Sequence, residues 1–357
     1  MKKIAVLGHG KIGAAIYRSL KFHNMDVTVG DKYATAAYLH EVDATNYTAL
    51  KNWLKDYEVV LCAMPYFVVP TVARVAADLG VAYFDLTEDR ESTSVVKSLK
   101  SNSVLVPQCG LAPGSVSVIA SHLIKHFDEV KSVDIRVGAL PLFPNNAIQY
   151  YLTWSTNGLV NEYCNLCDAI HEGKRVELMP LEGYEKLSID GQPYEAFNTS
   201  GGIGSLCETL EGKVEKLTYK TIRYDGHHRL MKFLLDDLNL SKNRDLFIQL
   251  FDQEVPQTTR DVVIVFVKAV GISGGKLMEK TYFNKVYGDS NESAIQKTTV
   301  GGICAAMYSW MTGDWDKKGF VRQEEIDWWS YVNSIWGSVY ATSDPEFSTN
   351  RHYEKVI

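Results

Sequence analysis

The sequence has little of what several protein classes require. Six cysteines among 357 residues are too few for a disulfide scaffold and suit a reducing cytoplasm. No apolar run reaches the roughly 18 to 20 residues that span a bilayer, and the densest run, 262–267, is short and β-branched, which predicts a buried strand. The apolar run near the N-terminus ends at Gly8 without a small-residue cleavage site, so it predicts a strand and not a signal peptide. We therefore expect a cytoplasmic protein with no membrane partner.

An excess of positive charge is also missing. Lysine and arginine total 37 against 43 aspartates and glutamates, giving a net charge of −6 that offers nucleic acid no basic field. The 46% hydrophobic and 22% charged content is the balance of a globular chain, which excludes intrinsic disorder. A length of 357 residues predicts two domains.

A glycine motif follows the first predicted strand. Residues 4–7 are apolar, residues 8–13 read Gly-His-Gly-Lys-Ile-Gly, and residues 14–22 have helical spacing. This order of strand, glycines and helix is typical of a dinucleotide site. Gly8 permits the tight turn, Gly10 lets a pyrophosphate approach the backbone, and Gly13 lets helix and strand pack closely. Lys11 and Ile12 lie between these glycines and are predicted to contact the cofactor, because the helix N-terminus that follows offers free N–H groups and a positive dipole end to phosphate.

A second strand, 26–30, ends at an acidic residue about twenty positions beyond the glycines. Asp31 is placed to accept hydrogen bonds from an adenosine ribose, and its carboxylate repels a 2′-phosphate. The sequence therefore predicts NAD as the cofactor, while the neighbouring Lys32 keeps NADP possible. Asp43 begins a turn, 43–46, that we expect at the adenine edge.

Three later strands, 59–63, 81–85 and 104–107, continue a regular alternation with helices. Ligands of such doubly wound sheets lie beyond the carboxyl ends of the strands. The loops at those ends therefore supply the remaining predicted cofactor contacts: Ala63, Met64, Pro65, Asp85, Leu86, Thr87, Gly110 and Pro113.

The pattern changes from about residue 128, where strands no longer alternate with helices. Strands are predicted at 133–137, 152–154 and 262–267, which favours an α+β domain with a mixed or antiparallel sheet. Helices are predicted at 159–170, 293–311 and 324–339. Five tryptophans in the last sixty residues are expected to pack domains or subunits together: Trp310, Trp315, Trp328, Trp329 and Trp336.

Cys164 and Cys167 have the spacing of a redox or zinc motif. A closed zinc site needs four ligands, and no second cysteine pair exists. On a helix over 159–170 the two thiols face the same side, so we interpret them as core residues and predict no metal site.

Several motifs resemble those of saccharopine reductases and lysine 6-dehydrogenases. They cover nearly the whole chain, at 110–114, 138–141, 144–150, 153–155, 199–202, 210–214, 220–227 and 294–299. The resemblance implies a Rossmann domain over 1–125, completed by about 310–357, with an inserted α+β substrate and dimerisation domain over 126–309. It also implies a homodimer or higher homo-oligomer.

Within this family the sequence favours one activity but leaves others open. The chain is shorter than typical saccharopine reductases, and its Arg-Tyr-Asp-Gly-His at 223–227 is similar to the lysine 6-dehydrogenase form. The resemblance thus implies NAD(P)-dependent oxidative deamination of a small-molecule substrate, an amino acid or a diamine. Ala147 stands where the family commonly has proline, so secondary-amine chemistry of the saccharopine or carboxynorspermidine dehydrogenase type stays open. A non-enzymatic NAD-binding regulator is the third alternative.

Oxidation of a carbon that bears an amino group needs a fixed donor carbon, a base and an anchor for the carboxylate. Arg223 is the predicted anchor because a guanidinium binds a carboxylate bidentately. His227, ahead of its neighbour His228, is the predicted base because imidazole titrates near neutrality. Tyr150, Thr199 and Ser200 are expected to orient the amine or water. Asp85 and Glu88 are candidates for the nicotinamide ribose or a cationic ammonium.

Overall fold

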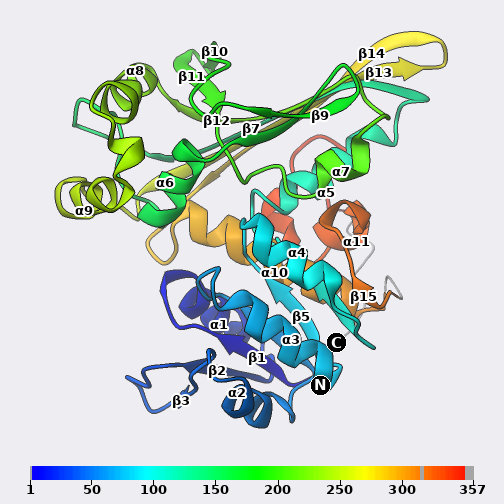
Figure 1. Ribbon diagram of the computed structural model, residues 1–357. Coiled ribbons are helices and arrows are strands. Elements are labelled where there is room, and N and C mark those ends of the chain that lie inside the picture. The colour runs from blue at the N-terminus through cyan, green and yellow to red at the C-terminus, as the bar shows by residue number, and fades with distance from the viewer. Residues whose placement is uncertain (1, 314–316, 350–357) are drawn as a thin grey trace. The chain divides into compact units, whose positions relative to one another are not determined.

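The computed structural model describes residues 2–313 and 317–349 (Figure 1). Its chain divides into two compact units. Unit 1 comprises the residues up to Val118 together with those from Thr298 onward, and unit 2 comprises Ile119–Lys297. The second unit is therefore inserted into the first, and the C-terminal part of the chain returns to the N-terminal unit.

Unit 1 is built on a parallel sheet of seven strands, in the order β15-β6-β5-β4-β1-β2-β3. The strands are β1 (Ile4–Leu7), β2 (Val27–Asp31), β3 (Leu39–Glu41), β4 (Val59–Cys62), β5 (Ala82–Asp85), β6 (Val104–Val106) and β15 (Gly319–Phe320). Every neighbouring pair is parallel. The residues of β1 and β4 are wholly buried, as expected for strands covered on both faces. The predicted Rossmann architecture is confirmed.

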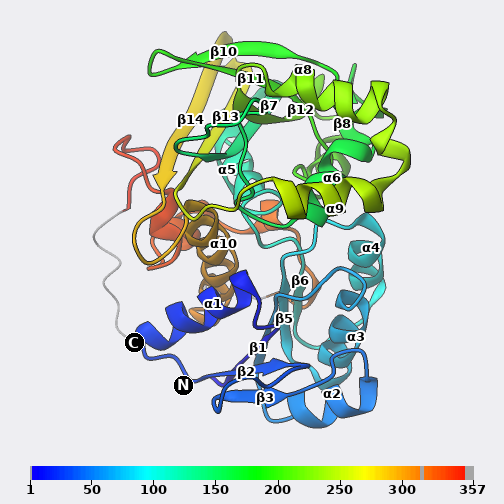
Figure 2. The ribbon, with the colours of Figure 1, turned by 90° about the vertical axis from the view of Figure 1, so that its left-hand side faces the viewer.

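Helices cover both faces of this sheet. α1 (Lys11–Phe22) and α10 (Ala294–Met311) lie on one face, and α2 (Tyr47–Leu54), α3 (Val69–Leu79) and α4 (Arg90–Ser98) lie on the other (Figure 2). α3 lays Val69, Val72 and Ala76 against Val60 of β4 and Tyr83 of β5 in one apolar core. α5 (Ser115–Ile124) begins at the last residues of unit 1.

The returning C-terminal segment adds β15 beside β6, at one edge of the sheet. The single helix predicted over 324–339 is wrong, because three short elements occupy this stretch: η3 (Gln323–Glu325), α11 (Trp328–Val332) and η4 (Gly337–Tyr340). The break has a local cause, since Asp327 caps α11 by accepting from Trp329 N and Ser330 N.

The tryptophans of this segment have contacts inside unit 1. Trp328 is fully buried against Phe347, and Trp336 Nε1 donates to Ser19 Oγ at 2.9 Å. Trp310 lies 6.2 Å from Phe84, centroid to centroid. Trp315 lies outside the described residues. The aromatic side chains thus attach the returning segment to the sheet and helices of its own unit.

Unit 2 is built on a mixed sheet of eight strands, which confirms the predicted class of the second domain. The main order is β10-β11-β12-β7-β13-β14, with β8 pairing β12 and β9 pairing β8. The pair β12–β7 is parallel and the others are antiparallel. The strands are β7 (Glu129–Pro141), β8 (Cys167–His171), β9 (Lys174–Leu178), β10 (Glu185–Ile189), β11 (Gln192–Asn198), β12 (Lys216–Tyr224), β13 (Asp261–Ser273) and β14 (Lys276–Tyr287).

Most of the helices of unit 2 gather beside β11 and β12, while α7 (Leu206–Leu210) lies apart from them, on the side of β8 and β9 (Figure 1). The others are α6 (Thr156–Cys164), α8 (His227–Lys232), η1 (Phe233–Asp237), η2 (Leu240–Lys242) and α9 (Arg244–Glu254). Leu159 of α6, Phe197 of β11, Met231 of α8 and Phe247 of α9 share one buried apolar cluster. This cluster packs α6 against β11, α8 and α9, and the site described below depends on that packing.

Two predicted elements of unit 2 are wrong. Residues 152–154 form no strand, only a single bridge from Leu152 to Gln257. The helix predicted over 159–170 ends at Cys164, and β8 begins at Cys167, where Cys167 and Ala169 are buried and alternate with the partly exposed Asp168. Pairing with β12 and β9 overrides the helical propensity, so the two thiols do not share a helix face, and both are free.

Candidate active site

The glycine loop of unit 1 forms an open cradle at the start of α1. Gly8 has φ +94°, and a Cβ on it would lie 2.6 Å from the Ala63 carbonyl oxygen. A Cβ on Gly13 would lie 2.0 Å from the Gly8 carbonyl oxygen, so helix and loop touch there. A Cβ on Gly10 would meet nothing within 4 Å, and no side chain caps α1. The structure therefore leaves room for a pyrophosphate at the helix N-terminus, with Lys11 and Ile12 in its first turn.

Asp31 lies at the carboxyl end of β2, beside this cradle. Its Oδ2 accepts from His9 N at 2.7 Å and its Oδ1 accepts from Tyr33 N at 3.0 Å. Lys32 pairs with Asp43 at 3.4 Å, and hydrogen bonds from Thr45 lower the pKa of Asp43. The predicted adenosine residues thus gather at the ends of β2 and β3, with the Asp31 carboxylate fixed toward the glycine loop.

An aromatic contact at the same end was not predicted. Tyr38 stacks on Tyr17 of α1, with ring centroids 5.2 Å apart, and its hydroxyl lies 3.2 Å from His9 Nε2. Tyr33, next in the chain to Lys32, is 71% exposed. The sequence shows tyrosines at 17, 33 and 38, but only the fold brings Tyr17 to Tyr38 and Tyr38 to His9 of the glycine loop.

Asp85, which was predicted to contact the nicotinamide ribose or a cationic ammonium, has protein donors around its carboxylate. Its side chain is fully buried and accepts three hydrogen bonds, from Tyr83 Oη at 2.7 Å, Thr87 N at 2.8 Å and Gln108 N at 3.0 Å. Burial raises the pKa of Asp85 to about 6. The carboxylate ties the loops after β5 and β6 together, and Leu86 and Thr87 follow it in the first of these loops.

The loop with Gly110 and Pro113 is supported by the returning C-terminal segment. Ser115 Oγ lies 3.0 Å from the Gly110 carbonyl oxygen and 2.6 Å from Tyr331 Oη. Gln323 Nε2 donates to the Pro107 carbonyl oxygen at 3.0 Å. These supporting residues come from about 215 positions along the chain, which is why local sequence patterns did not indicate them.

In unit 2, Arg223 is the centre of a buried polar cluster. Its side chain is 2% exposed. Nε donates to Tyr163 Oη at 2.8 Å, and Nη1 donates to the Ile222 carbonyl oxygen at 2.9 Å. The guanidinium carbon lies 5.3 Å from the ring centroid of Tyr150. An arginine is seldom buried so completely unless it binds a partner or a ligand.

His227 is fully buried beside Arg223, and both of its ring nitrogens are occupied. Nδ1 lies 2.7 Å from the Ile148 carbonyl oxygen, and Nε2 lies 2.9 Å from Tyr163 Oη. A carbonyl can only accept, so Nδ1 carries the proton and Tyr163 donates to Nε2. Burial, and then the charge of Arg223, lowers the pKa of His227 to about 3. This geometry suits a neutral residue that orients Tyr163 and, through it, Arg223.

Glu162 belongs to the same cluster and was missed. Its Oε2 lies 3.6 Å from Arg223 Nη2, beyond hydrogen-bond distance, and has no hydrogen-bond partner among the described residues. Burial raises the pKa of Glu162 to about 7, although Arg223 lowers it. Glu162 stands three positions after the buried Leu159, and a glutamate on the apolar face of a helix was the available signal.

The remaining predicted residues surround this cluster. The Tyr150 hydroxyl and the Oγ1 atoms of Thr153 and Thr199 are buried and have no hydrogen-bond partner within the described part of the chain. Ser200 holds α6, with N donating to the Glu162 carbonyl oxygen at 3.0 Å and Oγ donating to the Asn161 carbonyl oxygen at 2.9 Å. Several buried polar atoms without partners point to a site that a polar ligand completes.

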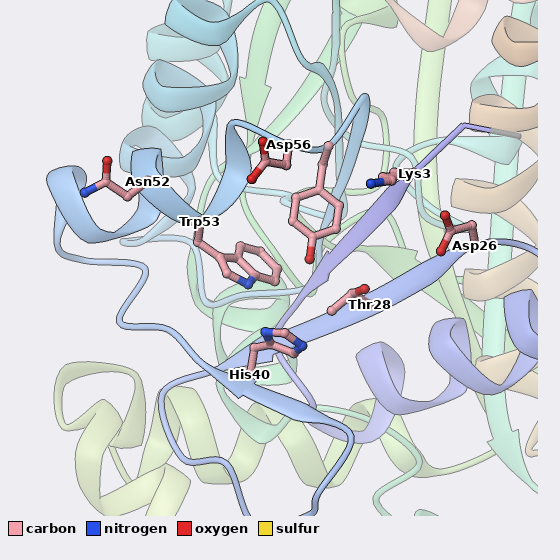
Figure 3. A pocket seen from close by; sticks show the side chains of 8 residues that line it. Lys3, Asp26, Thr28, His40, Asn52, Trp53 and Asp56 are labelled. Atoms are coloured by element: carbon pink, nitrogen blue, oxygen red, sulfur yellow. The ribbon is translucent and has the colours of Figure 1, made fainter.

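A groove of about 350 Å³ in unit 1 lies elsewhere (Figure 3). It is lined by Lys3, Asp26, Thr28 and Trp53, among others, at the amino ends of β1 and β2. The glycine loop is at the carboxyl end of the same sheet, so this groove does not take the cofactor. Within residues 2–313 and 317–349 no group of histidine, cysteine and acidic side chains could hold a metal ion, and no helix is long and apolar enough to cross a membrane.

Comparison with family models identifies both units. Residues 4–109 match the saccharopine dehydrogenase NADP binding domain, and residues 110–339 match the saccharopine dehydrogenase C-terminal domain. The chain belongs to the saccharopine dehydrogenase family and has its NAD(P)-binding oxidoreductase fold. The predicted family and an NAD(P) cofactor are thereby confirmed.

Solved structures agree on the fold. Apo saccharopine dehydrogenase (L-Glu forming) from Saccharomyces cerevisiae is similar with a TM-score of 0.72 and 17% identity, over 91% of this chain and 94% of that chain. DAP dehydrogenase from C. glutamicum, in complex with DAP, has a TM-score of 0.52 at 12% identity, over 92% and 95%. An engineered D-amino acid dehydrogenase bound to NADP+ has a TM-score of 0.50 at 13% identity, over the same shares.

Proposed function

We propose that this protein is an NAD-dependent dehydrogenase that oxidises an amino-bearing carbon of an amino acid, as a lysine 6-dehydrogenase does. The observation that carries the proposal is Arg223, a buried guanidinium whose Nη2 makes no hydrogen bond within the described residues. Such a group binds a carboxylate strongly, because charge-assisted hydrogen bonds are strengthened where water is excluded. Amino-acid substrates carry that carboxylate.

Each residue of the cluster then has a task. Arg223 anchors the substrate carboxylate, and Tyr163 and His227 hold the guanidinium in place from its Nε side. The unpartnered Tyr150 hydroxyl and Thr199 Oγ1 orient the amine or the water that hydrolyses the imine. When bound, NAD would supply the hydride acceptor, and the glycine loop of unit 1 would hold its pyrophosphate. His227 acts as a positioning residue in this proposal, since a pKa near 3 keeps it neutral.

The choice of NAD over NADP depends on Asp31. Its carboxylate is fixed by two backbone N–H groups next to the glycine loop, where it can bind ribose hydroxyls and repel a 2′-phosphate. Lys32 is paired with Asp43, which reduces the positive charge available to a phosphate.

A panel of amino acids with NAD tests the activity. Lysine should give NADH and free ammonia in equal amounts. NADH without ammonia, obtained with saccharopine or a carboxylated polyamine, would instead establish secondary-amine chemistry. NAD binding with no turnover of any amine would favour the regulator.

The assembly we propose is a cytoplasmic homodimer that uses the edge of the unit 2 sheet. β14 is an edge strand, and its Leu277, Met278 and Tyr287 are 68%, 43% and 52% exposed. Exposed apolar side chains on an edge strand favour pairing with another chain. Light scattering should give a dimer for the wild type and a monomer for Leu277→Lys/Tyr287→Lys. None of the six cysteines, all of which lie in the described part of the chain, forms a disulfide, which supports a reducing compartment.

A further inference from the structure

The buried carboxylate of Glu162 has an oxygen to which no group of the described chain donates a hydrogen bond. Oε2 is buried without a hydrogen bond among the described residues, and its nearest cation, Arg223 Nη2, is 3.6 Å away. A buried carboxylate oxygen without a donor is unfavourable, because it has given up its hydrogen bonds to water and gained none in return. The group that completes it must therefore be a donor, and a cationic donor stabilises it most.

On Arg223, the N–H groups of Nη2 have no hydrogen-bond acceptor among the described residues. Of its five N–H groups, one on Nε and one on Nη1 have acceptors, and Nη2 has none within the described residues. Tyr163 fills the Nε side, so the guanidinium edge that remains faces Glu162. Arg223 Nη2 and Glu162 Oε2 thus form an ion pair at 3.6 Å without a hydrogen bond between them, so each can still bind a ligand group of opposite charge.

An α-amino acid head group carries the matching charges on one carbon. We propose that Arg223 and Glu162 together bind this zwitterionic head group, with the guanidinium holding the α-carboxylate and Glu162 Oε2 accepting from the α-ammonium. The proposal rests on the function proposed above and names its substrate class as diamino acids. The α-nitrogen bound as an ammonium has no lone pair to form an imine, so oxidation is directed to the distal amine.

Three probes separate the two halves of the head group. L-lysine carries both charges, 6-aminohexanoate lacks the α-ammonium, and pentane-1,5-diamine lacks the carboxylate. Wild-type kcat/KM should be about 10- to 100-fold higher for lysine than for 6-aminohexanoate, the factor that a charge-assisted hydrogen bond supplies. In Glu162→Gln the ratio of kcat/KM for lysine to kcat/KM for 6-aminohexanoate should fall to about 1, because neither probe then gains from an α-ammonium contact.

Glu182→Gln is the matched control, because Glu182 pairs with Lys232 at the surface of the same unit. Equal wild-type kcat/KM for lysine and 6-aminohexanoate would overturn the head-group proposal and leave the dehydrogenase proposal standing. An equal loss of kcat/KM for lysine and for 6-aminohexanoate in Glu162→Gln would also overturn it, because that result would show a structural role for Glu162. Thermal melting shows whether the variant is folded.

Binding is measured separately from turnover. Calorimetry with lysine and 6-aminohexanoate should show the same 10- to 100-fold preference, roughly, in the wild type and none in Glu162→Gln. If no probe is oxidised, the dehydrogenase proposal fails, and the binding ratio alone then supports or overturns the head-group proposal.

Discussion

Tyr163 donates its hydroxyl proton to Nε2 of His227 across 2.9 Å, while the same oxygen accepts from Arg223. This single hydroxyl joins a neutral histidine to a buried cation. Because both ring nitrogens of His227 are bonded to protein groups, this histidine cannot take a proton directly from a substrate in this arrangement. Arg223 and His227, the predicted anchor and the predicted base, therefore lie in one cluster. The geometry suits His227 as a positioning residue and not as a base.

The first prediction concerns the dependence of stability on pH. The pKa of His227 is lowered from 6.5 to about 3, so the unfolded chain takes up a proton that the native state refuses, and stability is lost as pH falls from 6.5 toward 3. The pKa of Glu162 is raised from 4.5 to about 7, so stability is lost as pH rises from 4.5 toward 7. Between about pH 4.5 and 6.5 the two contributions oppose each other, each at up to about 1.4 kcal/mol per pH unit.

Single variants separate these contributions. In Glu162→Gln the free energy of unfolding should fall on acidification from pH 6.5 to 4.5 more steeply than in the wild type. His227→Gln should show the reverse, with stability falling as pH rises. Urea unfolding of the cofactor-free protein at three pH values measures both slopes, and slopes equal to the wild type would show that neither group is held in the state described.

The second prediction uses two glycines of one loop. Gly10→Val should abolish NAD binding and leave the melting temperature near the wild-type value, because its Cβ enters open space and its φ of −72° suits any residue. Gly13→Ala should lower stability by about 1–3 kcal/mol, because its Cβ meets the Gly8 carbonyl. Calorimetry and thermal melting measure the pair. Retained NAD affinity in Gly10→Val would place the pyrophosphate elsewhere.

The third prediction concerns cofactor choice. Asp31→Ser should raise the affinity for NADP by about tenfold or more and weaken NAD, since the carboxylate that repels a 2′-phosphate is removed. Adding Lys32→Ala to this variant should reverse part of the gain. Titration with both cofactors checks the change, and tighter wild-type binding of NADP than of NAD would refute the role of Asp31.

The fourth prediction tests the support of the Gly110 loop by the returning segment. Tyr331→Phe deletes the hydroxyl that lies 2.6 Å from Ser115 Oγ and should cost about 1 kcal/mol of stability. NAD should stabilise the variant less than it stabilises the wild type. Tyr340→Phe is a matched control, because its hydroxyl bonds to the Thr298 carbonyl oxygen and not to this loop. If NAD raises the stability of both variants by the same amount, the Gly110 loop does not contribute to cofactor binding.

Features of the fold that depend on residues close together in the chain could be predicted from the sequence. The glycine motif, the buried strands and the acidic residue at the end of β2 lie within 31 residues, and each has a stereochemical reason readable in order. The helix over 159–170 was wrong because Cys167–His171 pairs with β12, a partner some forty-five residues away that helical spacing cannot show.

The cluster around Arg223 was predicted only in part. Arg223, His227 and Tyr150 have residue types that suggest chemistry, but the roles of Glu162 and Tyr163 depend on the contacts of α6 with Arg223 of β12. The burial of Asp85 likewise follows from hydrogen bonds to loops of two strands. Contacts between distant segments, which no periodicity encodes, decide which polar residues are free to meet a ligand.

The central claim is that the Arg223 cluster holds the carboxylate of an amino acid that the enzyme oxidises with NAD. It is tested most directly by NADH formation from lysine in the wild type and in Arg223→Lys, which keeps the charge but loses the bidentate edge. The account predicts turnover by the wild type and a loss of about 100-fold or more in kcat/KM, mainly through KM, in the folded variant. Wild-type kcat/KM in Arg223→Lys would contradict it.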